Sequence, residues 1–392
     1  MYSSEEIREK ALSVAQMCVS EYGFLASSVQ KDNYKRVFAR DSMILSIAVM
    51  HEGEHFLAAF KNSLETLLQK QGPQGEIPSN VDPFNDAVSF GGTAGRVDSN
   101  LWLLIGFSQY IKKTNDIFFL KTHFDALKKT YTLLKSWEYN TKGFLYVPQG
   151  GDWADEYILE GYVLYDQILY YKALEEYSYL CSLVSVDFNH SRIASLKEKI
   201  TVNFFPLNEH ESSEFVYHKT LFARSHELWN GNHALASIAP GFIGNQFDSF
   251  AHGLGFLFGF FEDYKDTIVS FIDTVCVDRV HAFYPVIEKD SLFWHKLSSN
   301  YSYAFKNEPY HYHNGGVWPL TMGFLISGLS AIGEDILAQK LFTHLCALLK
   351  NSDFNEYYTG DSLIPSGVPF LGFSVAGFLI ADRALQGKEV FL

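Results

Sequence analysis

The feature that most constrains the fold of this chain is the recurrence of apolar residues at helical spacing in about a dozen separate segments. In one of them, over 98–112, the side chains of Leu101, Leu104 and Ile105 fall on one face of a helix. Segments with the alternating pattern of a half-buried strand are scarce. The pattern therefore predicts an all-α protein. The predicted helices cover roughly residues 4–22, 40–51, 55–70, 98–112, 115–138, 161–182, 189–204, 247–261, 264–277, 316–331, 333–350 and 370–386.

Long loops rich in Gly, Asn, Asp and aromatic residues separate these helices, mostly after every second one. Loops of such length are usually functional. If pairs of helices place their connections alternately at two ends, twelve helices close into an (α/α)6 toroid, a ring of six helical hairpins with the long active-site loops at one end. No Pro/Ser-rich linker or low-complexity tract divides the chain, so residues 1–392 are expected to form one domain. The loops run over 71–97, 139–160, 205–246, 278–315 and 351–369.

Composition and charge exclude several classes of partner. Hydrophobic residues make up 47% of the chain and charged residues 19%, which is enough to bury a large core. The excess of 45 acidic over 31 basic residues gives a net charge of -14, which repels phosphate backbones and anionic lipid. Neither nucleic acid nor a membrane is therefore expected as a partner. The N-terminal residues lack the apolar core of a secretory signal, and Pro319 interrupts the longest apolar stretch.

The four cysteines point to a reducing compartment. They are widely separated, and each lies in an apolar helical stretch, which favours buried free thiols and a cytoplasmic location. No Cys-x-x-Cys motif and no Cys/His pair with metal-ligand spacing occurs, and the phosphate-loop, dinucleotide and nucleophile-elbow motifs are absent. No cofactor and no metal are expected. The cysteines are Cys18, Cys181, Cys276 and Cys346.

One acidic motif lies in the loop 150–156, which reads Gly-Gly-Asp-Trp-Ala-Asp-Glu. It holds Asp152, Asp155 and Glu156 around Trp153. Carboxyl groups beside a large apolar ring are suited to pKa tuning, because desolvation raises one pKa while a neighbouring charge keeps another group ionised. The alternative is that these carboxylates cap the helix that follows.

A second acidic motif is Glu356, followed by Tyr357 and Tyr358 in the loop between the last two predicted helices. Aromatic residues and a Gly-rich segment flank this glutamate, and no Lys or Arg at helical spacing pairs with it. It is a candidate catalytic carboxylate, and a solvated loop residue is the alternative.

Three further aspartates open predicted helices after long loops. They are Asp41, which follows Arg40, then Asp98 and Asp248. Each one alone is best explained as a helix cap. Because a toroid gathers alternate helix starts around one mouth, together they would present several carboxylates to a hydroxyl-rich ligand.

The segment 310–319 combines polar donors with aromatic rings directly before a buried helix. His311 and His313 are two positions apart, but no third metal ligand is placed by spacing. Asn314 and Trp318 suit sugar recognition instead, since a sugar ring stacks on an aromatic face while amide and imidazole groups bind its hydroxyls. The aromatic content of 16% agrees with this reading.

The order of these motifs resembles the neutral/alkaline invertases of glycoside hydrolase family 100. The resemblance runs in register from about residue 33 to 382. The motifs that carry it are Val37-Phe38-Ala39-Arg40-Asp41, Val97-Asp98-Ser99-Asn100-Leu101-Trp102, Gly244-Asn245-Gln246-Phe247-Asp248, His313-Asn314-Gly315-Gly316-Val317-Trp318-Pro319, Glu356-Tyr357-Tyr358 and Phe373-Ser374-Val375-Ala376-Gly377-Phe378.

The resemblance implies an (α/α)6 barrel and an inverting hydrolase that cleaves the glycosidic bond of sucrose. It places the catalytic acid on Asp155 and the catalytic base on Glu356. A small sugar or oligosaccharide is the implied partner, and self-association is compatible with the fold. The residues expected to bind the substrate are Arg40, Asp41, Asp98, Trp153, Asp248, His313, Asn314, Trp318 and Tyr357.

Two segments depart from the invertase pattern. The acid loop is more similar to the Trp-x-Asp motif of bacterial amylo-α-1,6-glucosidase-type enzymes, and Asn355 and Thr359 differ from the residues expected beside the base. Because the acid loop also shapes the leaving-group subsite, another α-glucoside remains an alternative to sucrose. A sugar epimerase using His311 and His313, and a non-catalytic sugar-binding protein, are the two alternatives of a different class.

Overall fold

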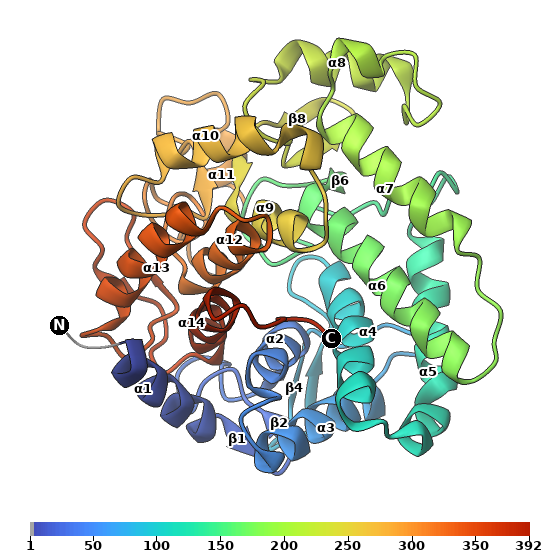
Figure 1. Ribbon diagram of the computed structural model, residues 1–392, viewed down its shortest axis with the longest axis vertical. Coiled ribbons are helices and arrows are strands. Elements are labelled where there is room, and N and C mark those ends of the chain that lie inside the picture. Colours follow the sequence, from blue (N-terminus) through green and yellow to red (C-terminus); the bar gives the residue numbers. More distant parts are fainter. Residues whose placement is uncertain (1–3) are drawn as a thin grey trace.

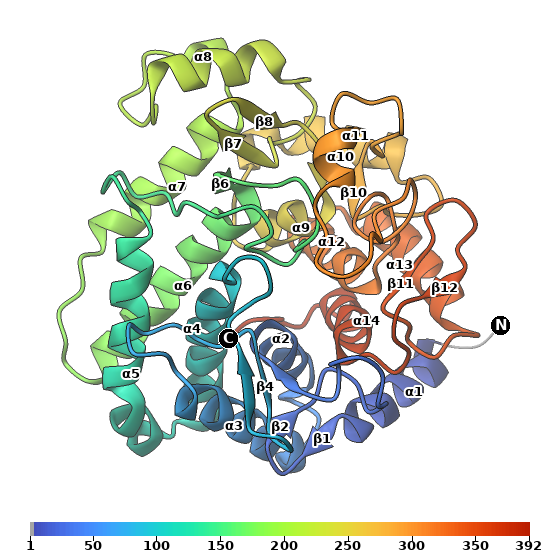
Figure 2. The same cartoon turned by 180° about the vertical axis from the view of Figure 1, so that it is seen from behind.

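The computed structural model describes residues 4–392 and has a closed ring of helices at its centre (Figures 1 and 2). Each of six inner helices packs against the next one along the chain, and the last packs against the first. The predicted (α/α)6 toroid is therefore confirmed. The inner helices are α2 (Ala39–Val49), α4 (Val97–Thr114), α6 (Leu164–Leu183), α9 (Ser249–Leu257), α12 (Pro319–Ala331) and α14 (Gly372–Leu385).

Six outer helices alternate with the inner ones along the chain. The outer helix α3 packs against α2 and α4, α5 packs against α4 and α6, and α13 packs against α12 and α14. This alternation is the reason why the polar face of each outer helix meets solvent while the inner helices are apolar nearly all round. The outer helices are α1 (Ser4–Met17), α3 (Glu54–Gln69), α5 (Ile117–Ser136), α7 (Ser191–Phe204), α10 (Lys265–Val275) and α13 (Asp335–Leu349).

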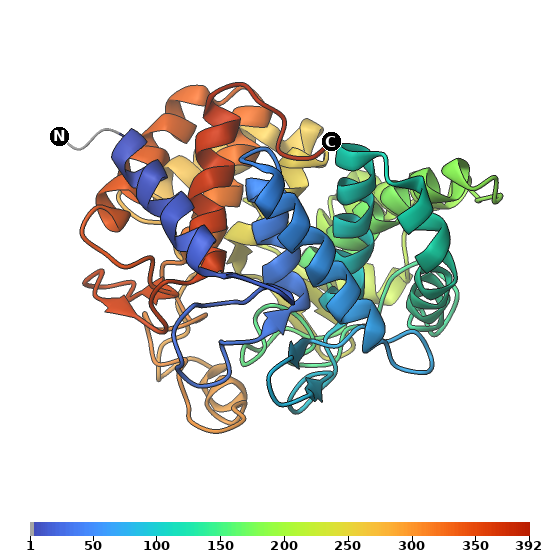
Figure 3. The same ribbon diagram turned by 90° about the horizontal axis from the view of Figure 1, so that it is seen from below.

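The two ends of the ring differ in the length of their connections. An inner helix is joined to the next outer helix by a short segment, such as 50–53 or 115–116, whereas the return to an inner helix takes a long loop such as 70–96 or 276–318. Figure 3 shows these loops gathered at one face of the ring. The N-terminal ends of all six inner helices therefore open toward the same set of loops.

Short strands tie these loops together. β3 (Val37–Phe38) pairs with β4 (Asn80–Asp82), and β4 pairs with β5 (Ala87–Ser89). A second three-stranded sheet and two strand pairs hold the remaining loops. Two or three residues are too few to show an alternating pattern, so the sequence did not reveal them. These strands are β6 (Tyr162–Val163), β7 (Ser237–Ala239) and β8 (Phe242–Gly244), then β9 (Phe247–Asp248) with β10 (Phe283–Tyr284), and β11 (Tyr357–Tyr358) with β12 (Pro365–Ser366).

All twelve predicted helices are present, with three notable differences. The first ends at Met17 because the chain then turns through β1 (Val19–Ser20) and β2 (Gly23–Phe24). The segments 205–246 and 278–315, predicted as loops, contain α8 (Lys219–Leu228) and α11 (Trp294–Ser298). Short 3-10 turns also occur at Asn208–His210 and Glu262–Tyr264. Across residues 4–392, no helix has the length and apolar character that a membrane span would require.

Candidate active site

A cavity of about 700 Å³ opens among the loops at the face where the inner helices begin. This volume is in the usual range for a small-molecule site. Arg40 and Asp41 from the first turn of α2, Phe373 from α14 and Trp318 directly before α12 line it. The cavity therefore lies at the predicted mouth of the ring.

Stacked aromatic rings form part of its wall. The imidazole of His313 stacks on the indole of Trp318, with ring centroids 5.1 Å apart and an interplanar angle of 12°. Trp153 meets both rings edge-on, at 5.1 Å from His313 and 5.8 Å from Trp318. Burial lowers the pKa of His313 to about 3, so its imidazole is neutral near pH 7. These three predicted binding residues all line the cavity.

Arg40 and Asp41 line the cavity, and Asp98 lies behind them. The Arg40 guanidinium donates to Asp98 Oδ2 at 2.9 Å, and its Nε lies 3.7 Å from Asp41 Oδ2. Asp98 is fully buried and also accepts a hydrogen bond from the Tyr165 hydroxyl at 3.2 Å. Neither aspartate is an N-cap, because both lie in the first turn of their helices, and both carboxylates lie near Arg40. Asp98 does not line the cavity and instead orients Arg40.

Three other predicted binding residues do not line the cavity. Asp248 is an N-cap, and its Oδ1 accepts from the amides of Phe250 and Ala251 at 2.9 and 3.0 Å. Asn314 is fully buried and ties together two parts of the loop 276–318 through the backbone of Ile287. Tyr357 stacks behind Trp318, with ring centroids 5.6 Å apart. These side chains shape the site from behind.

Glu356 lies in the cavity at the start of β11, and both of its carboxylate oxygens are held. Oε1 accepts from the Tyr34 hydroxyl at 2.5 Å, and Oε2 accepts from the Val368 amide at 3.3 Å. Burial raises the pKa of Glu356, while the hydrogen bond from Tyr34 and the charge of Lys306 lower it. A Cβ at Gly367 would overlap the same carboxylate, so only glycine fits there.

Asp155 lines the same cavity and is oriented by Arg96. The Arg96 guanidinium makes an ion pair with Asp155 Oδ2 at 2.7 Å and also donates to the backbone carbonyl of Gly150. The other carboxylate oxygen, Oδ1, has no hydrogen bond. Asp155 is close enough to Glu356 for its charge to contribute to raising the pKa of that glutamate. The structure thus brings the two predicted catalytic carboxylates to one cavity.

The two other carboxylates of the acid loop differ from each other. Asp152 is buried away from the cavity and accepts from the Ala154 amide at 2.9 Å. Burial, together with the charges of Asp98 and Asp248, raises its pKa to about 8. Glu156 does line the cavity, and burial raises its pKa as well.

Sequence reasoning did not identify several polar residues of this cavity, among them Tyr34, Lys306 and Arg96. Tyr34 was missed because its partner Glu356 is 322 positions away, and no local pattern links them. Lys306, whose Nζ lies 4.9 Å from the centre of the Tyr312 ring, gave no signal either. Arg96 could have been found, because it directly precedes the motif that begins at Val97.

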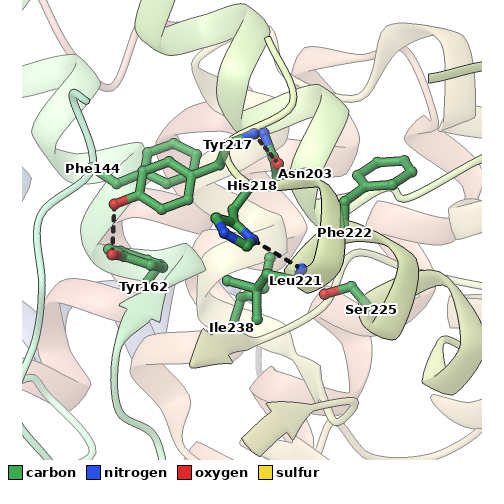
Figure 4. Close-up of a pocket in the computed structure, with 9 residues that line it drawn as sticks. All are labelled: Phe144, Tyr162, Asn203, Tyr217, His218, Leu221, Phe222, Ser225 and Ile238. Atoms are coloured by element: carbon green, nitrogen blue, oxygen red, sulfur yellow. Dashed lines mark hydrogen bonds between the residues drawn. The ribbon is translucent and has the colours of Figure 1, made fainter. Parts of the chain in front are cut away.

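A second cavity lies elsewhere, between α7, α8 and β7 (Figure 4). Its volume of about 10 Å³ leaves room for a single water molecule. The hydroxyls of Tyr162 and Tyr217 lie 2.6 Å apart at its edge. Of the residues in the described range 4–392, no three His, Cys, Asp or Glu side chains are grouped so that they could hold a metal ion.

An (α/α)6 ring with two carboxylates and stacked aromatic rings in one cavity is the arrangement expected of a glycoside hydrolase with this fold. A family model described as alkaline and neutral invertase matches residues 273–387. This range includes Glu356 and excludes the acid loop 150–156.

Plant invertases that are similar to this chain in sequence agree with this class. The chain is 24% identical over 446 residues to the probable chloroplastic alkaline/neutral invertase A of Arabidopsis thaliana, covering 96% of this chain and 69% of the relative. It is 24% identical over 455 residues to the mitochondrial neutral/alkaline invertase 1 of Oryza sativa subsp. japonica, covering 96% and 70%. The resemblance to these invertases, predicted from the motifs, is confirmed.

Solved structures share the fold at lower identity. A GH63 mannosylglycerate hydrolase from Thermus thermophilus, in complex with glucose, superposes with a TM-score of 0.67 at 14% identity, covering 96% of this chain and all of that one. A bacterial glucoamylase complexed with acarbose gives a TM-score of 0.66 at 12% identity, covering 98% and 56%. Together with the invertase matches, these likenesses support the expectation that the chain is a hydrolase.

Proposed function

We propose that this protein is an exo-acting, inverting glycoside hydrolase that releases a terminal α-glucosyl unit, with sucrose as the first candidate substrate. The observation that carries the proposal is the convergence of Asp155 and Glu356, about 200 residues apart in the sequence, on one cavity lined by stacked aromatic rings. An inverting glycosidase requires two such carboxyl groups, one on each side of the scissile bond.

In the proposed reaction, Asp155 acts as the general acid and Glu356 as the general base. Protonated Asp155 donates its proton to the glycosidic oxygen as the bond to the anomeric carbon breaks. Ionised Glu356 removes a proton from a water molecule, which attacks the anomeric carbon from the opposite face. The products are a free leaving group and a glucose of inverted anomeric configuration.

The neighbouring side chains position these two groups and the terminal sugar. Tyr34 orients the Glu356 carboxylate, and Arg96 orients Asp155. Trp318 and His313 add apolar surface to the cavity wall for the sugar ring, while Arg40 and Asp41 offer a donor and an acceptor to its hydroxyls.

Two observations show why the identity of the leaving group has to be determined by experiment. The matched family range does not reach the acid loop, which shapes the leaving-group subsite. Structures with the same fold are named for different substrates, as the glucoamylase and the mannosylglycerate hydrolase show. An epimerase is less well supported, because His311 does not line the cavity.

Time-resolved proton NMR of the purified protein with sucrose, maltose, isomaltose and trehalose tests this function. Consumption of a substrate with β-glucose appearing before mutarotation supports an inverting α-glucosidase. α-Glucose appearing first would overturn inversion. A changed sugar with an unchanged number of reducing ends would indicate an epimerase, and binding without turnover would indicate a sugar-binding protein.

The catalytic assignments are tested by three isosteric variants. We expect Asp155→Asn and Glu356→Gln each to lower kcat at least about 100-fold, the lower range for loss of a general acid or base. Glu156→Gln is the matched control, since Glu156 lines the same cavity, and it is expected to keep kcat within about tenfold. If the Asp155→Asn variant is active and the Glu156→Gln variant is inactive, Glu156 and not Asp155 is the general acid. Circular dichroism verifies that each variant is folded.

We also propose that the chain acts as one domain in the cytoplasm. The closed ring formed by segments from α2 to α14 supports a single domain. The four cysteines are free thiols, and three of them are buried, which suits a reducing compartment. The two invertases compared above are named chloroplastic and mitochondrial, so fractionation of the native source is the relevant test.

A further inference from the structure

Tyr303 is an exposed aromatic residue at the entrance of the cavity. Its side chain is 98% exposed, yet it lines the catalytic cavity. The rings of Tyr301 and Phe305 on either side of it pack against each other, with centroids 6.3 Å apart. Within residues 4–392, no such ring contact involves Tyr303. A large aromatic face is thus left open at the entrance of the site.

The backbone contacts place Tyr303 beside the acid loop. The amide of Ser302 donates to Glu156 Oε1 at 3.2 Å, and Glu156 directly follows the proposed acid Asp155. A Cβ at Gly92, on the opposite loop of the cavity, would lie 3.4 Å from Ser302 Oγ. Tyr303 therefore directly follows Ser302, the residue whose amide binds the loop that carries the proposed proton donor Asp155.

The segment that carries Tyr303 is anchored to the acid loop on both sides. Asn300 donates to the carbonyl of Tyr157 at 2.8 Å, and Asn307 donates to the carbonyl of Glu156 at 2.8 Å. These bonds fix the backbone around Tyr303 relative to Asp155. A backbone anchored in this way pre-organises the position from which the Tyr303 side chain extends.

The depth of the cavity determines which part of a substrate Tyr303 can meet. Arg40 and Asp41, in the first turn of α2, line the cavity with side chains only 20% and 10% exposed, whereas Tyr303 is 98% exposed, so these two residues mark its inner end. In an exo-acting enzyme the terminal sugar occupies that end, so the leaving group remains at the entrance.

We infer that Tyr303 is the platform on which the leaving-group sugar stacks, and that it makes the enzyme selective for a sugar leaving group over a small one. The inference rests on the proposed function. The apolar face of the tyrosine ring contacts the C–H face of a sugar, and its hydroxyl remains in water. Because almost none of Tyr303 is buried, its removal leaves the fold unchanged.

The test compares two substrates that share the glycosyl unit and differ in the leaving group. One is the disaccharide found to be hydrolysed, and the other is the glycosyl fluoride of the same sugar, whose leaving group is a single atom. Tyr303→Ala is expected to lower kcat/KM for the disaccharide roughly tenfold, a typical effect of losing an apolar contact. For the fluoride, the change should stay within about twofold.

Two further variants serve as controls. Tyr303→Phe keeps the ring and is expected to retain activity on both substrates. Tyr301→Ala removes a neighbouring tyrosine that does not line the cavity, and it should leave the ratio of the two activities unchanged.

The outcomes separate this inference from the proposed function. An equal loss on both substrates, or no loss on either, overturns the platform role of Tyr303. A folded wild-type protein that hydrolyses neither the fluoride nor any disaccharide overturns the proposed function and this inference with it. An active wild type that is insensitive to Tyr303→Ala overturns this inference alone.

Discussion

At the scale of single residues, the contact between Tyr34 and Glu356 has the largest influence on the proposed base. Burial of Glu356 favours its neutral form, whereas a general base must be ionised. The Tyr34 hydroxyl donates to the carboxylate and so counteracts burial. We therefore expect this hydrogen bond to extend the activity of the proposed site toward lower pH.

Replacement of Tyr34 by phenylalanine tests this role. The Tyr34→Phe variant loses the hydrogen bond that lowers the pKa of Glu356, so this pKa rises. When the pH is lowered, the variant therefore loses activity at a higher pH than the wild type does. A hydrogen bond to a charged group contributes about 1.5–3 kcal/mol, so we expect the acidic limb of the kcat profile to move up by about 1–2 pH units. The measurement is the pH dependence of kcat. Tyr162→Phe, in the distant cavity of Figure 4, should keep the wild-type profile.

A Tyr34→Phe profile that coincides with the wild type would contradict this role. A lower kcat with an unshifted acidic limb would show that Tyr34 only positions the carboxylate.

The candidate site was predictable where chemistry shows in a local motif. Asp155, Glu356 and Trp318 stand in such motifs, and the structure brings all three to one cavity. Asp248 has the same kind of local pattern, but its carboxylate serves the backbone of α9. A motif therefore predicts that a polar residue lies at the mouth of the ring. The orientation of its side chain depends on the surrounding fold.

At the scale of helices, the closest approach in the ring is that of α12 and α14. A Cβ at Gly323 would overlap the backbone carbonyl of Gly377, and a Cβ at Gly377 would overlap that of Pro319. The two glycines allow the backbones to pack directly against each other.

Substitution at this crossing tests how the ring closes. Gly323→Ala forces α12 and α14 apart, and overpacking of this kind costs about 1–3 kcal/mol of the free energy of unfolding. Chemical denaturation provides the measurement. Gly95→Ala is the matched control, because a Cβ there meets only an ordinary contact of 3.7 Å, and it should change stability by less than about 0.5 kcal/mol. Equal stability of both variants would contradict the tight crossing.

The helices were more predictable than the elements between them. The inner helices α4 and α6 stand out in the sequence as long segments rich in apolar residues, because these helices are buried on most sides. The five-residue helix α11 is too short to show a period, and α8 buries only Phe222 and Ser225. Their positions depend on contacts with distant loops, which a single sequence does not reveal.

At the scale of the whole molecule, the ring collects buried carboxyl groups from different helices. Asp98 lies on α4, Asp166 on α6 and Asp248 before α9, and all three are completely buried. Both carboxylate oxygens of Asp166 lack a hydrogen bond. Burial, together with the charges of Asp152, Asp98 and Asp248, raises the pKa of Asp166 well above its ordinary value of 3.8.

This raised pKa makes the stability of the ring dependent on pH, and Asp166→Asn tests the effect. Above pH 3.8 the unfolded protein loses the Asp166 proton while the folded protein keeps it, so the folded state binds more protons and its stability falls as pH rises. An asparagine cannot ionise and escapes this loss. We therefore expect Asp166→Asn to melt at least about 2 °C above the wild type at pH 8, with a smaller or reversed difference at pH 5.

The exposed Asp187 provides the matched control, and Asp187→Asn should follow the wild type at both pH values. A difference for Asp166→Asn that is independent of pH, or largest at pH 5, would show that the carboxyl group is ionised and paired within the ring. The sign of the pH dependence thus shows whether Asp166 is protonated or ionised in the folded protein. A protonated Asp166 relieves repulsion among the buried carboxylates, and an ionised one adds to it.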